Sequence, residues 1–221
     1  MCVLRDLARS GRLAATVAAA GPSELAALGA AAYEIVWPVV YQHLTRGLEL
    51  RRGHRRCASG VTLLTDECLD RFHDDVEAVV HDLLRNAHAE IQTVEAWLHG
   101  RLTAATVDGN RRRRGRRGAL QRPRMSGWLA AELGHDRWLI RLALHVLEWV
   151  GVPETAGSEV WPLDSWVALR PGATGDWDTD VRTVRSEVDL VLTAMRRRPD
   201  WYASYIERPL GAKIPPVAPT G

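Results

Sequence analysis

Apolar residues recur along most of this chain at the three- to four-residue spacing of an amphipathic α-helix. The clearest example is 66–85, where an aliphatic stripe lies on one face and most of the acids lie on the other. Weaker helical patterns cover 3–20, 24–48, 94–105, 128–133, 138–150 and 179–198. Since no stretch alternates in the manner of a half-buried strand, we predict an all-α fold.

Hydroxyl residues and prolines mark where these helices should begin, bend and end. Ser23 and Thr65 are predicted N-caps, because a hydroxyl oxygen can accept a hydrogen bond from a free amide of the first turn. Pro38 is predicted to kink or split the helix over 24–48. Pro199 is predicted to stop the last long helix.

The helical pattern breaks near 115–127, where Pro123 and Gly127 mark a boundary. A chain of 221 residues suits one large or two small domains. We predict a first helical domain over 1–118, a linker over 119–127, a second small helical domain over 128–206 and a Pro-rich tail over 207–221. The tail carries Pro209, Pro215, Pro216 and Pro219 and is expected to be extended and mobile.

Charge is segregated along the chain, although the net charge is only +2. The span 66–95 holds nine acids and two arginines, while no acid occurs between Asp108 and Glu132. An acidic segment followed by a basic one indicates two faces that have different partners.

The basic segment is the strongest functional signal. The chain has 28 arginines and a single lysine, yet eight arginines in the fourteen positions 111–124 exceed that bias. Such a concentration of cations requires an anion, and guanidinium groups match phosphate oxygens well. We therefore predict a DNA-binding segment made of Arg111, Arg112, Arg113, Arg114, Arg116, Arg117, Arg122 and Arg124. The alternative is a solvated linker of biased composition.

Cysteine usage and hydropathy indicate a cytoplasmic protein without a membrane partner. Three cysteines without a framework pattern fit a reducing compartment. No apolar run reaches the ~18 residues that a spanning helix needs. The first residues do not have the shape of a signal peptide, because Arg5 and Asp6 interrupt any apolar core.

Two sets of residues were weighed as metal ligands. His54, Cys57, Cys68 and His73 are four candidate zinc ligands, but their spacing matches no common finger. We therefore expect no metal site and no cofactor.

The second set consists of three His-Asp pairs, which begin at His73, His81 and His135 and resemble those of helical metal-dependent phosphohydrolases. Three copies in one chain indicate chance. These pairs are the basis of one functional hypothesis, a helical metal-dependent phosphohydrolase, which ranks third. Our expectation is that the chain is not an enzyme.

The segment 76–84 in the first half reads V-E-A-V-V-H-D-L-L. It is similar to A-E-D-L-V-Q-E-V-F in region 2 of bacterial RNA polymerase sigma factors, in particular the small extracytoplasmic-function members. Farther on, A-W-L at 96–98, V-D at 107–108 and R-R at 111–112 resemble the family's A-W-L, I-D and R-R at equal spacing. The resemblance covers roughly 24–118, about half of the chain.

This resemblance implies a transcription initiation protein whose partners are core RNA polymerase and promoter DNA, with an anti-sigma or other regulatory protein as a further candidate. The acidic helix would dock on the polymerase through Asp74, Asp75, Glu77 and Asp82. His88, Gln92 and Thr93 would line a pocket for unstacked bases of the −10 element, and the arginines would hold the nucleic-acid backbone. The second hypothesis is an all-α nucleic-acid-binding or interaction protein that does not contact the polymerase.

The second half does not follow a sigma factor's helix-turn-helix. The segment 138–150 is apolar on several sides, and 160–164 offers almost none of the polar side chains that a groove-reading helix needs. We predict that 128–206 packs as its own helical domain without specific DNA binding and serves docking, regulation or stabilisation of the first domain. A diverged winged helix is the alternative.

Overall fold

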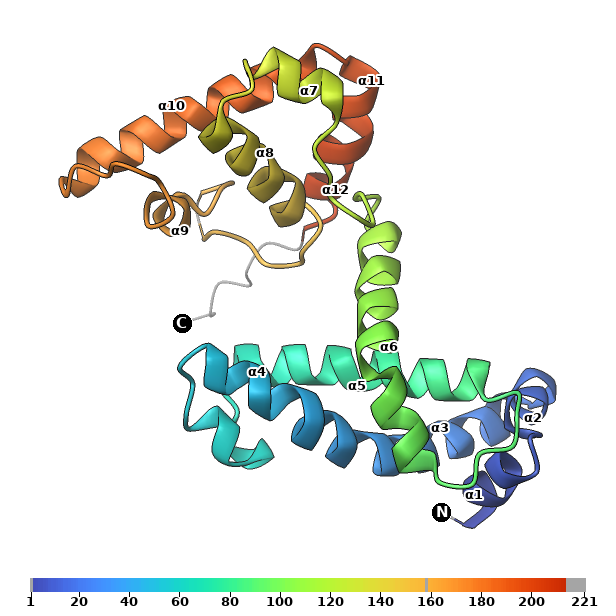
Figure 1. Cartoon of the computed structure of the whole chain (residues 1–221). Helices are drawn as coiled ribbons and strands as arrows, with labels where there is room; N and C mark the ends of the chain where they lie inside the picture. Colours follow the sequence, from blue (N-terminus) through green and yellow to red (C-terminus); the bar gives the residue numbers. More distant parts are fainter. Residues whose placement is uncertain (1, 158, 214–221) are drawn as a thin grey trace, which may run out of the picture. The chain divides into compact units, whose positions relative to one another are not determined.

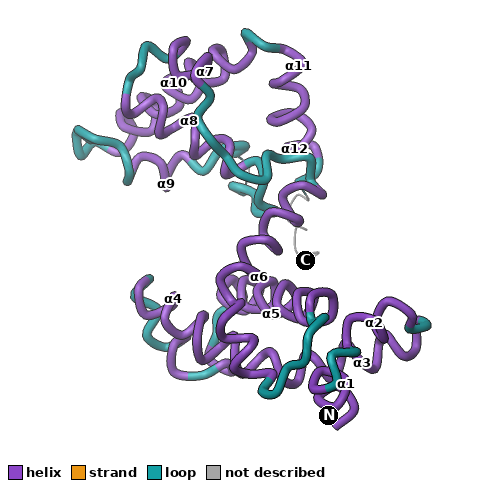
Figure 2. The backbone as a smooth tube through the Cα atoms, turned by 45° about the vertical axis from the view of Figure 1, so that its right-hand side comes forward, coloured by secondary structure: helices purple, strands orange, loops and turns teal. Residues whose placement is uncertain are grey.

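The computed structural model describes residues 2–157 and 159–213, and their regular structure is helical throughout (Figure 1, Figure 2). Extended pairing among the described residues is limited to an isolated antiparallel bridge between Ala156 and Glu159. The all-α prediction is therefore confirmed.

The chain divides into two compact units, Met1–Asn110 and Arg111–Gly221. The division falls within α6 (Val94–Arg116), which continues through Gly109 into the arginine-rich segment. The division comes before the linker predicted over 119–127. It falls inside a helix, because α6 does not end where the arginines begin.

Unit 1 is a bundle built around two long helices, α3 and α5. Its elements are α1 (Cys2–Arg9), α2 (Leu13–Ala19), α3 (Pro22–Val40), the π-helical turn η1 (Tyr41–Thr45), α4 (Arg46–Arg51), the 3-10 turns η2 (Cys57–Ser59) and η3 (Val61–Leu63), α5 (Asp66–Asn86) and α6. α3 and α5 lie side by side, with α1 and α2 at one end of the pair and α4 at the other (Figure 1, Figure 2).

The core of unit 1 is made of the apolar stripes that the sequence predicts. Ile35, Val36 and Val39 of α3 are buried in one cluster with Phe72 and Val76 of α5. Each buried aliphatic side chain contributes about 1.5–3 kcal/mol. The cluster continues through Val79 and Leu83 to Leu98 and Leu102 of α6, so α5 is packed into the core from Phe72 to Leu84.

The predicted helix over 3–20 is two helices, α1 and α2, which are separated at Gly11. Gly11 has a φ of +67°, a left-handed conformation that ends α1. A Cβ atom at this position would lie 3.3 Å from the backbone nitrogen of Glu90, so the chain crosses closely here. The backbone amide of Ile91 donates to the carbonyl of Ala8, which fixes the crossing.

Pro38 neither ends nor splits its helix, as it lies inside α3. The irregularity comes three residues later, in η1, and helical structure then continues through α4 to Arg51. The resulting helix Pro22–Arg51 is long and apolar enough to cross a membrane by length and composition alone. Core helices pass the same test, and six residues of α3 are buried in the core of unit 1.

Unit 2 is a second helical bundle in which α10 packs against α7, α8, α9 and α11. Its elements are α7 (Gly127–Glu132), α8 (Arg137–Trp149), α9 (Leu163–Val167), α10 (Trp177–Arg196), α11 (Pro199–Tyr202), the π-helical turn η4 (Ala203–Glu207) and α12 (Arg208–Gly211). Leu142, Val146 and Leu147 of α8 share one core with Val184 and Val188 of α10.

α10 ends at Arg196, as predicted from Pro199, and Pro199 then begins α11. The tail prediction is wrong at Pro209, which is buried in α12, because Pro is tolerated in the first turn of a helix. Pro215, Pro216 and Pro219 lie outside the described residues.

Candidate functional site

The eight arginines of the predicted DNA-binding segment lie in very different environments. Arg112, Arg116, Arg122 and Arg124 are exposed. Arg111, Arg113 and Arg117 are half-buried. Arg114 is buried, with only 5% of its surface exposed.

Arg114 corrects the sequence prediction, because its guanidinium is committed to unit 2. Nε donates to the carbonyl of Leu120 at 2.8 Å, Nη1 to Glu148 at 3.0 Å and Nη2 to Leu147 at 2.8 Å. The last two carbonyls lie at the C-terminal end of α8, where the Glu148 carbonyl also accepts from the backbone amide of Gly151 at 3.1 Å. Burial lowers the pKa of Arg114. A side chain held in this way cannot contact a phosphate.

The four exposed arginines offer charge that the described part of the chain does not neutralise. Arg112, Arg116, Arg122 and Arg124 make no ion pair or side-chain hydrogen bond with any described residue. Other arginines form ion pairs with acids, as Arg170 does with Glu187 at 3.0 Å. The exposed set is therefore the part of the predicted segment that is available to a phosphate backbone.

Asp82 corrects the prediction for the acidic helix. It is buried, and its carboxylate accepts two hydrogen bonds from Arg101 of α6, at 2.6 and 2.8 Å. Asn86 donates a third at 2.6 Å. The hydrogen bond and charge of Asp82 raise the pKa of Arg101. Asp82 therefore joins α5 to α6 and is not available to an external partner.

The other three predicted polymerase contacts lie nearer to the surface of α5. Glu77 is exposed, and Asp74 and Asp75 are half-buried. The opposite face of the helix is buried in the core, as its amphipathic pattern predicts. His88, Gln92 and Thr93 are exposed in the connection between α5 and α6.

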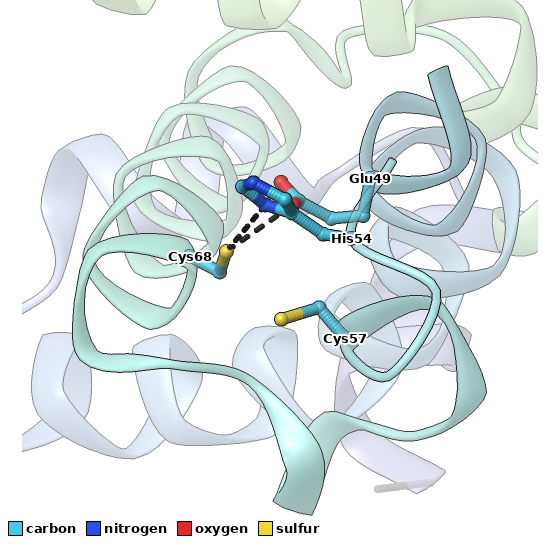
Figure 3. A group of neighbouring side chains, drawn as sticks. All are labelled: Glu49, His54, Cys57 and Cys68. Carbon is cyan, nitrogen blue, oxygen red and sulfur yellow. Dashed lines mark hydrogen bonds and ion pairs between the residues drawn. The ribbon is translucent and has the colours of Figure 1, made fainter. Parts of the chain in front are cut away.

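A separate group of side chains gathers where α4, its following loop and α5 meet (Figure 3). Glu49 comes from α4, His54 from the loop, Cys57 from η2 and Cys68 from the first turn of α5. Their ligand atoms all lie within 4.8 Å of one another. Three of the four zinc-ligand candidates in the sequence are thus brought together.

Sequence reasoning missed the fourth member of this group. His73 was the candidate by spacing, but it is exposed and is not among the gathered residues. Glu49 takes its place, with only 1% of its surface exposed. Nothing local in the sequence marks Glu49, because the partners that allow its burial, His54, Arg71 and Cys68, meet only in the fold.

The two oxygens of Glu49 have different partners. Oε2 lies 2.7 Å from His54 Nδ1 and 3.1 Å from Cys68 Sγ. Oε1 lies 3.0 Å from Arg52 Nη1 and 3.6 Å from Arg71 Nη2. Burial alone raises the pKa of Glu49, but the hydrogen bonds from Cys68, His54 and Arg52 outweigh it, so the pKa is lowered. The carboxylate is therefore ionised at neutral pH.

The two thiols differ in their electrostatics. The hydrogen bond from the Thr65 backbone is the main cause that lowers the pKa of Cys57, while burial raises the pKa of Cys68. The Thr65 side chain makes no capping hydrogen bond to α5 and interacts with these two thiols instead. Thr65 is the N-cap residue by position, as predicted, but its hydroxyl serves the cysteine pair.

The group opens to solvent on the side of the loop. Gly53, His54, Cys57 and Thr65 line an open pocket of about 730 Å³ together with neighbouring charged residues. His54 is the exposed member, whereas the other three are buried. A small ion can therefore reach the group from this side.

The His-Asp pairs of the enzyme hypothesis are not brought together in this way. Among the described residues, the group that could hold a metal ion includes none of them. Asp136 has a structural role, as its carboxylate caps α8 by accepting hydrogen bonds from the amides of Trp138 and Leu139. Asp82 is paired with Arg101, as described above.

Comparison with known proteins identifies no relative. The chain matches no protein-family profile, no curated protein and no solved structure.

Proposed function

We propose that this chain is a nucleic-acid-binding transcription protein of the sigma-factor type and is not itself an enzyme. The observation that carries the proposal is the exposure of Arg112, Arg116, Arg122 and Arg124 without a counter-ion in the described part of the chain. Phosphate is the anion that such a group of guanidinium side chains binds best. Arg111, Arg113 and Arg117 can add to this surface, and Arg114 does not.

The proposed contact with RNA polymerase uses α5. Glu77 provides an exposed charge, and Asp74 and Asp75 extend it along the helix. This arrangement fits the resemblance to sigma region 2, in which an acidic helix docks on a basic surface of the polymerase. Charges at the rim of an interface act mainly on the rate of encounter and on specificity.

We propose that unit 2 serves docking, regulation or stabilisation of unit 1 and does not read DNA sequence. The described part of unit 2 has an isolated bridge in place of the sheet that a winged helix contains. α8 is apolar on several sides and supplies four buried residues to the core, which leaves it poorly suited to a DNA groove.

DNA binding can be tested by fluorescence anisotropy with duplex and single-stranded DNA over a range of salt concentrations. The variant R112A/R116A should weaken binding to all sequences and reduce the slope of log K against log salt by up to about 0.9 per arginine on duplex DNA. R137A/R141A is the matched control, since it removes two exposed arginines from α8. An unchanged slope in R112A/R116A would overturn the proposed surface.

Polymerase contact needs a second measurement, which uses purified bacterial core RNA polymerase immobilised on a sensor surface. Binding to both the polymerase and DNA supports the proposal. DNA binding without polymerase binding selects the second hypothesis, an all-α nucleic-acid-binding protein. Binding to neither would overturn the proposal.

A further inference from the structure

We propose that Glu49, His54, Cys57 and Cys68 bind a structural Zn²⁺ ion that fastens α4 and its following loop to the start of α5. The site is independent of the proposed transcription function, because it shares no residue with the arginine surface or with the acidic face of α5. The proposal rests on the way four ligand atoms from separate segments converge on one point (Figure 3).

The distances between the ligand atoms suit a tetrahedral ion. Zn–S bonds of about 2.3 Å and Zn–N or Zn–O bonds of about 2.0–2.1 Å place neighbouring ligand atoms roughly 3.3–3.8 Å apart. Here Cys68 Sγ lies 3.4 Å from His54 Nδ1 and 3.1 Å from Glu49 Oε2. His54 Nδ1 and Glu49 Oε2 lie 2.7 Å apart and must separate by roughly 0.6 Å, and all four ligand atoms lie within 4.8 Å of one another. Small side-chain movements therefore bring all four atoms to a common centre.

The donor set favours zinc over other common ions. Two thiolates and an imidazole select a borderline or soft metal and disfavour Mg²⁺ and Ca²⁺, which prefer oxygen ligands. Four protein ligands fill a tetrahedral shell and leave no open position for a substrate, which indicates a structural and not a catalytic ion.

The surroundings balance the charge of the occupied site. Two thiolates and one carboxylate around Zn²⁺ leave a net charge of about −1. Arg52 and Arg71 both lie beside Glu49 Oε1, and Arg71 Nη2 also donates to Cys68 Sγ at 3.2 Å. Thr65 interacts with both thiols. Partners of this kind orient metal ligands and stabilise their charged forms.

The site has a clear structural task. α4 ends at Arg51 and α5 begins at Asp66, and the connection between them contains only the short turns η2 and η3. A metal ion that joins the loop to both helices stabilises the folded state by its binding free energy, because the unfolded chain lacks the preformed site.

The test uses the full-length chain, purified under reducing conditions with alkylation of a sample at lysis to record the thiol state. Its metal content is measured by mass spectrometry, and the metal-free protein is titrated with Co²⁺ and then with Zn²⁺. We expect one zinc per chain and an intense thiolate-to-cobalt charge-transfer band with tetrahedral d–d bands. We also expect zinc to raise Tm by about 5 °C or more.

The variants separate this site from adventitious binding. C57S, C68S, H54N and E49Q should lose the bound zinc or weaken its binding by at least about tenfold. The matched controls C2S and H73N should keep one zinc per chain, and H73N also tests the ligand that spacing alone favours. A cobalt charge-transfer band with the wild-type intensity and the wild-type titration midpoint in both C57S and C68S would overturn the proposal.

The wild-type titration decides the question even where a variant fails to fold. Absence of zinc together with absence of a thiolate-to-cobalt band in the reduced wild-type chain would overturn the proposal. A Cys57–Cys68 disulfide trapped at lysis would overturn it as well, because oxidised sulfurs cannot bind zinc as thiolates.

Discussion

The guanidinium of Arg114 lies directly against Gly151, at the position that a Cβ atom on residue 151 would occupy. A Cβ atom at residue 151 would therefore displace this guanidinium from its position. The same guanidinium donates to the carbonyls of Leu147 and Glu148, so Arg114 serves as the C-terminal cap of α8. An arginine from a segment that looks like a nucleic-acid surface is part of the core of unit 2.

Substitution of either residue should destabilise unit 2. Arg114→Ala removes the hydrogen bonds to the carbonyls of Leu120, Leu147 and Glu148, and Gly151→Ala forces the guanidinium out, so each should lower the free energy of unfolding by about 2–4 kcal/mol. The measurement is urea denaturation followed by circular dichroism. Arg112→Ala is the control and should stay within about 0.5 kcal/mol of wild type. If Arg114→Ala and Gly151→Ala had the same free energy of unfolding as Arg112→Ala, the capping role of Arg114 would be contradicted.

Asp180 should make the stability of unit 2 sensitive to acid. Its carboxylate accepts hydrogen bonds from the backbone amide and hydroxyl of Thr174 and from the amide of Gly175. The Thr174 backbone bond is the main cause that lowers the pKa of Asp180, against the opposing effect of burial. The folded pKa is therefore below the unfolded one of about 3.9. The stabilisation is present above that value and is lost as pH falls through the folded pKa.

The check on Asp180 is a comparison of Asp180→Asn with wild type in urea denaturation from pH 7 to pH 3. The variant should have the lower midpoint at pH 7, and the difference should shrink as the pH falls below about 4. Asp178→Asn is the control, as Asp178 lies in the same helix turn and is exposed. A constant difference across this range would refute the electrostatic explanation.

Lys213 should titrate far below an ordinary lysine. Its ammonium donates to the carbonyls of Val152 and Glu154 and lies 4.1 Å from the centre of the Trp149 ring. Burial lowers the pKa of Lys213 to about 8, against about 10.4 for a free lysine. The unfolded chain binds the proton more tightly between these values, so this group makes stability rise with pH there.

The sequence makes the measurement on Lys213 simple, because it is the sole lysine of the chain. Selective ¹³C labelling of lysine gives one side-chain signal, and its chemical shift can be followed from pH 6 to pH 11. The midpoint should lie near 8 in the folded protein and return to the ordinary range in urea. A folded midpoint above about 10 would show that the ammonium is solvated.

Sequence periodicity predicted most of the helices, because each one buries a stripe of apolar side chains. The stripe on α5 holds from Phe72 to Leu83 as expected. Periodicity did not predict the break at Gly11, since that break depends on the close passage of Glu90, nearly 80 positions away. Local pattern carries no information about which distant backbone crosses a helix end.

At the candidate sites too, the local sequence does not reveal which distant partner a charged residue has. Asp82 and Arg114 both look like surface charges in the sequence, yet each is buried because a partner from another helix satisfies it. Glu49 was overlooked for the same reason, as its partners His54, Arg71 and Cys68 come together only in the fold. Spacing identified His54, Cys57 and Cys68 as chemically interesting, but it could not select their fourth neighbour.

Glu77 and Asp82, two acids on the same helix, should respond in opposite ways to substitution. Glu77 is exposed, so Glu77→Lys should leave the free energy of unfolding within about 0.5 kcal/mol of wild type. If α5 docks on the polymerase, the same variant should weaken polymerase binding by at least about tenfold at low salt, because a rim charge is reversed.

Asp82→Asn should behave as a stability variant. It removes the charge that pairs with Arg101 across α5 and α6, at a cost of about 1–3 kcal/mol. Polymerase binding should stay within about twofold of wild type at temperatures well below Tm, since Asp82 faces Arg101 and not the solvent. Arg101→Gln breaks the same pair from the other side and should reproduce both results. Loss of polymerase binding in Asp82→Asn, with Glu77→Lys unaffected, would mean that α5 does not dock through its exposed acidic face.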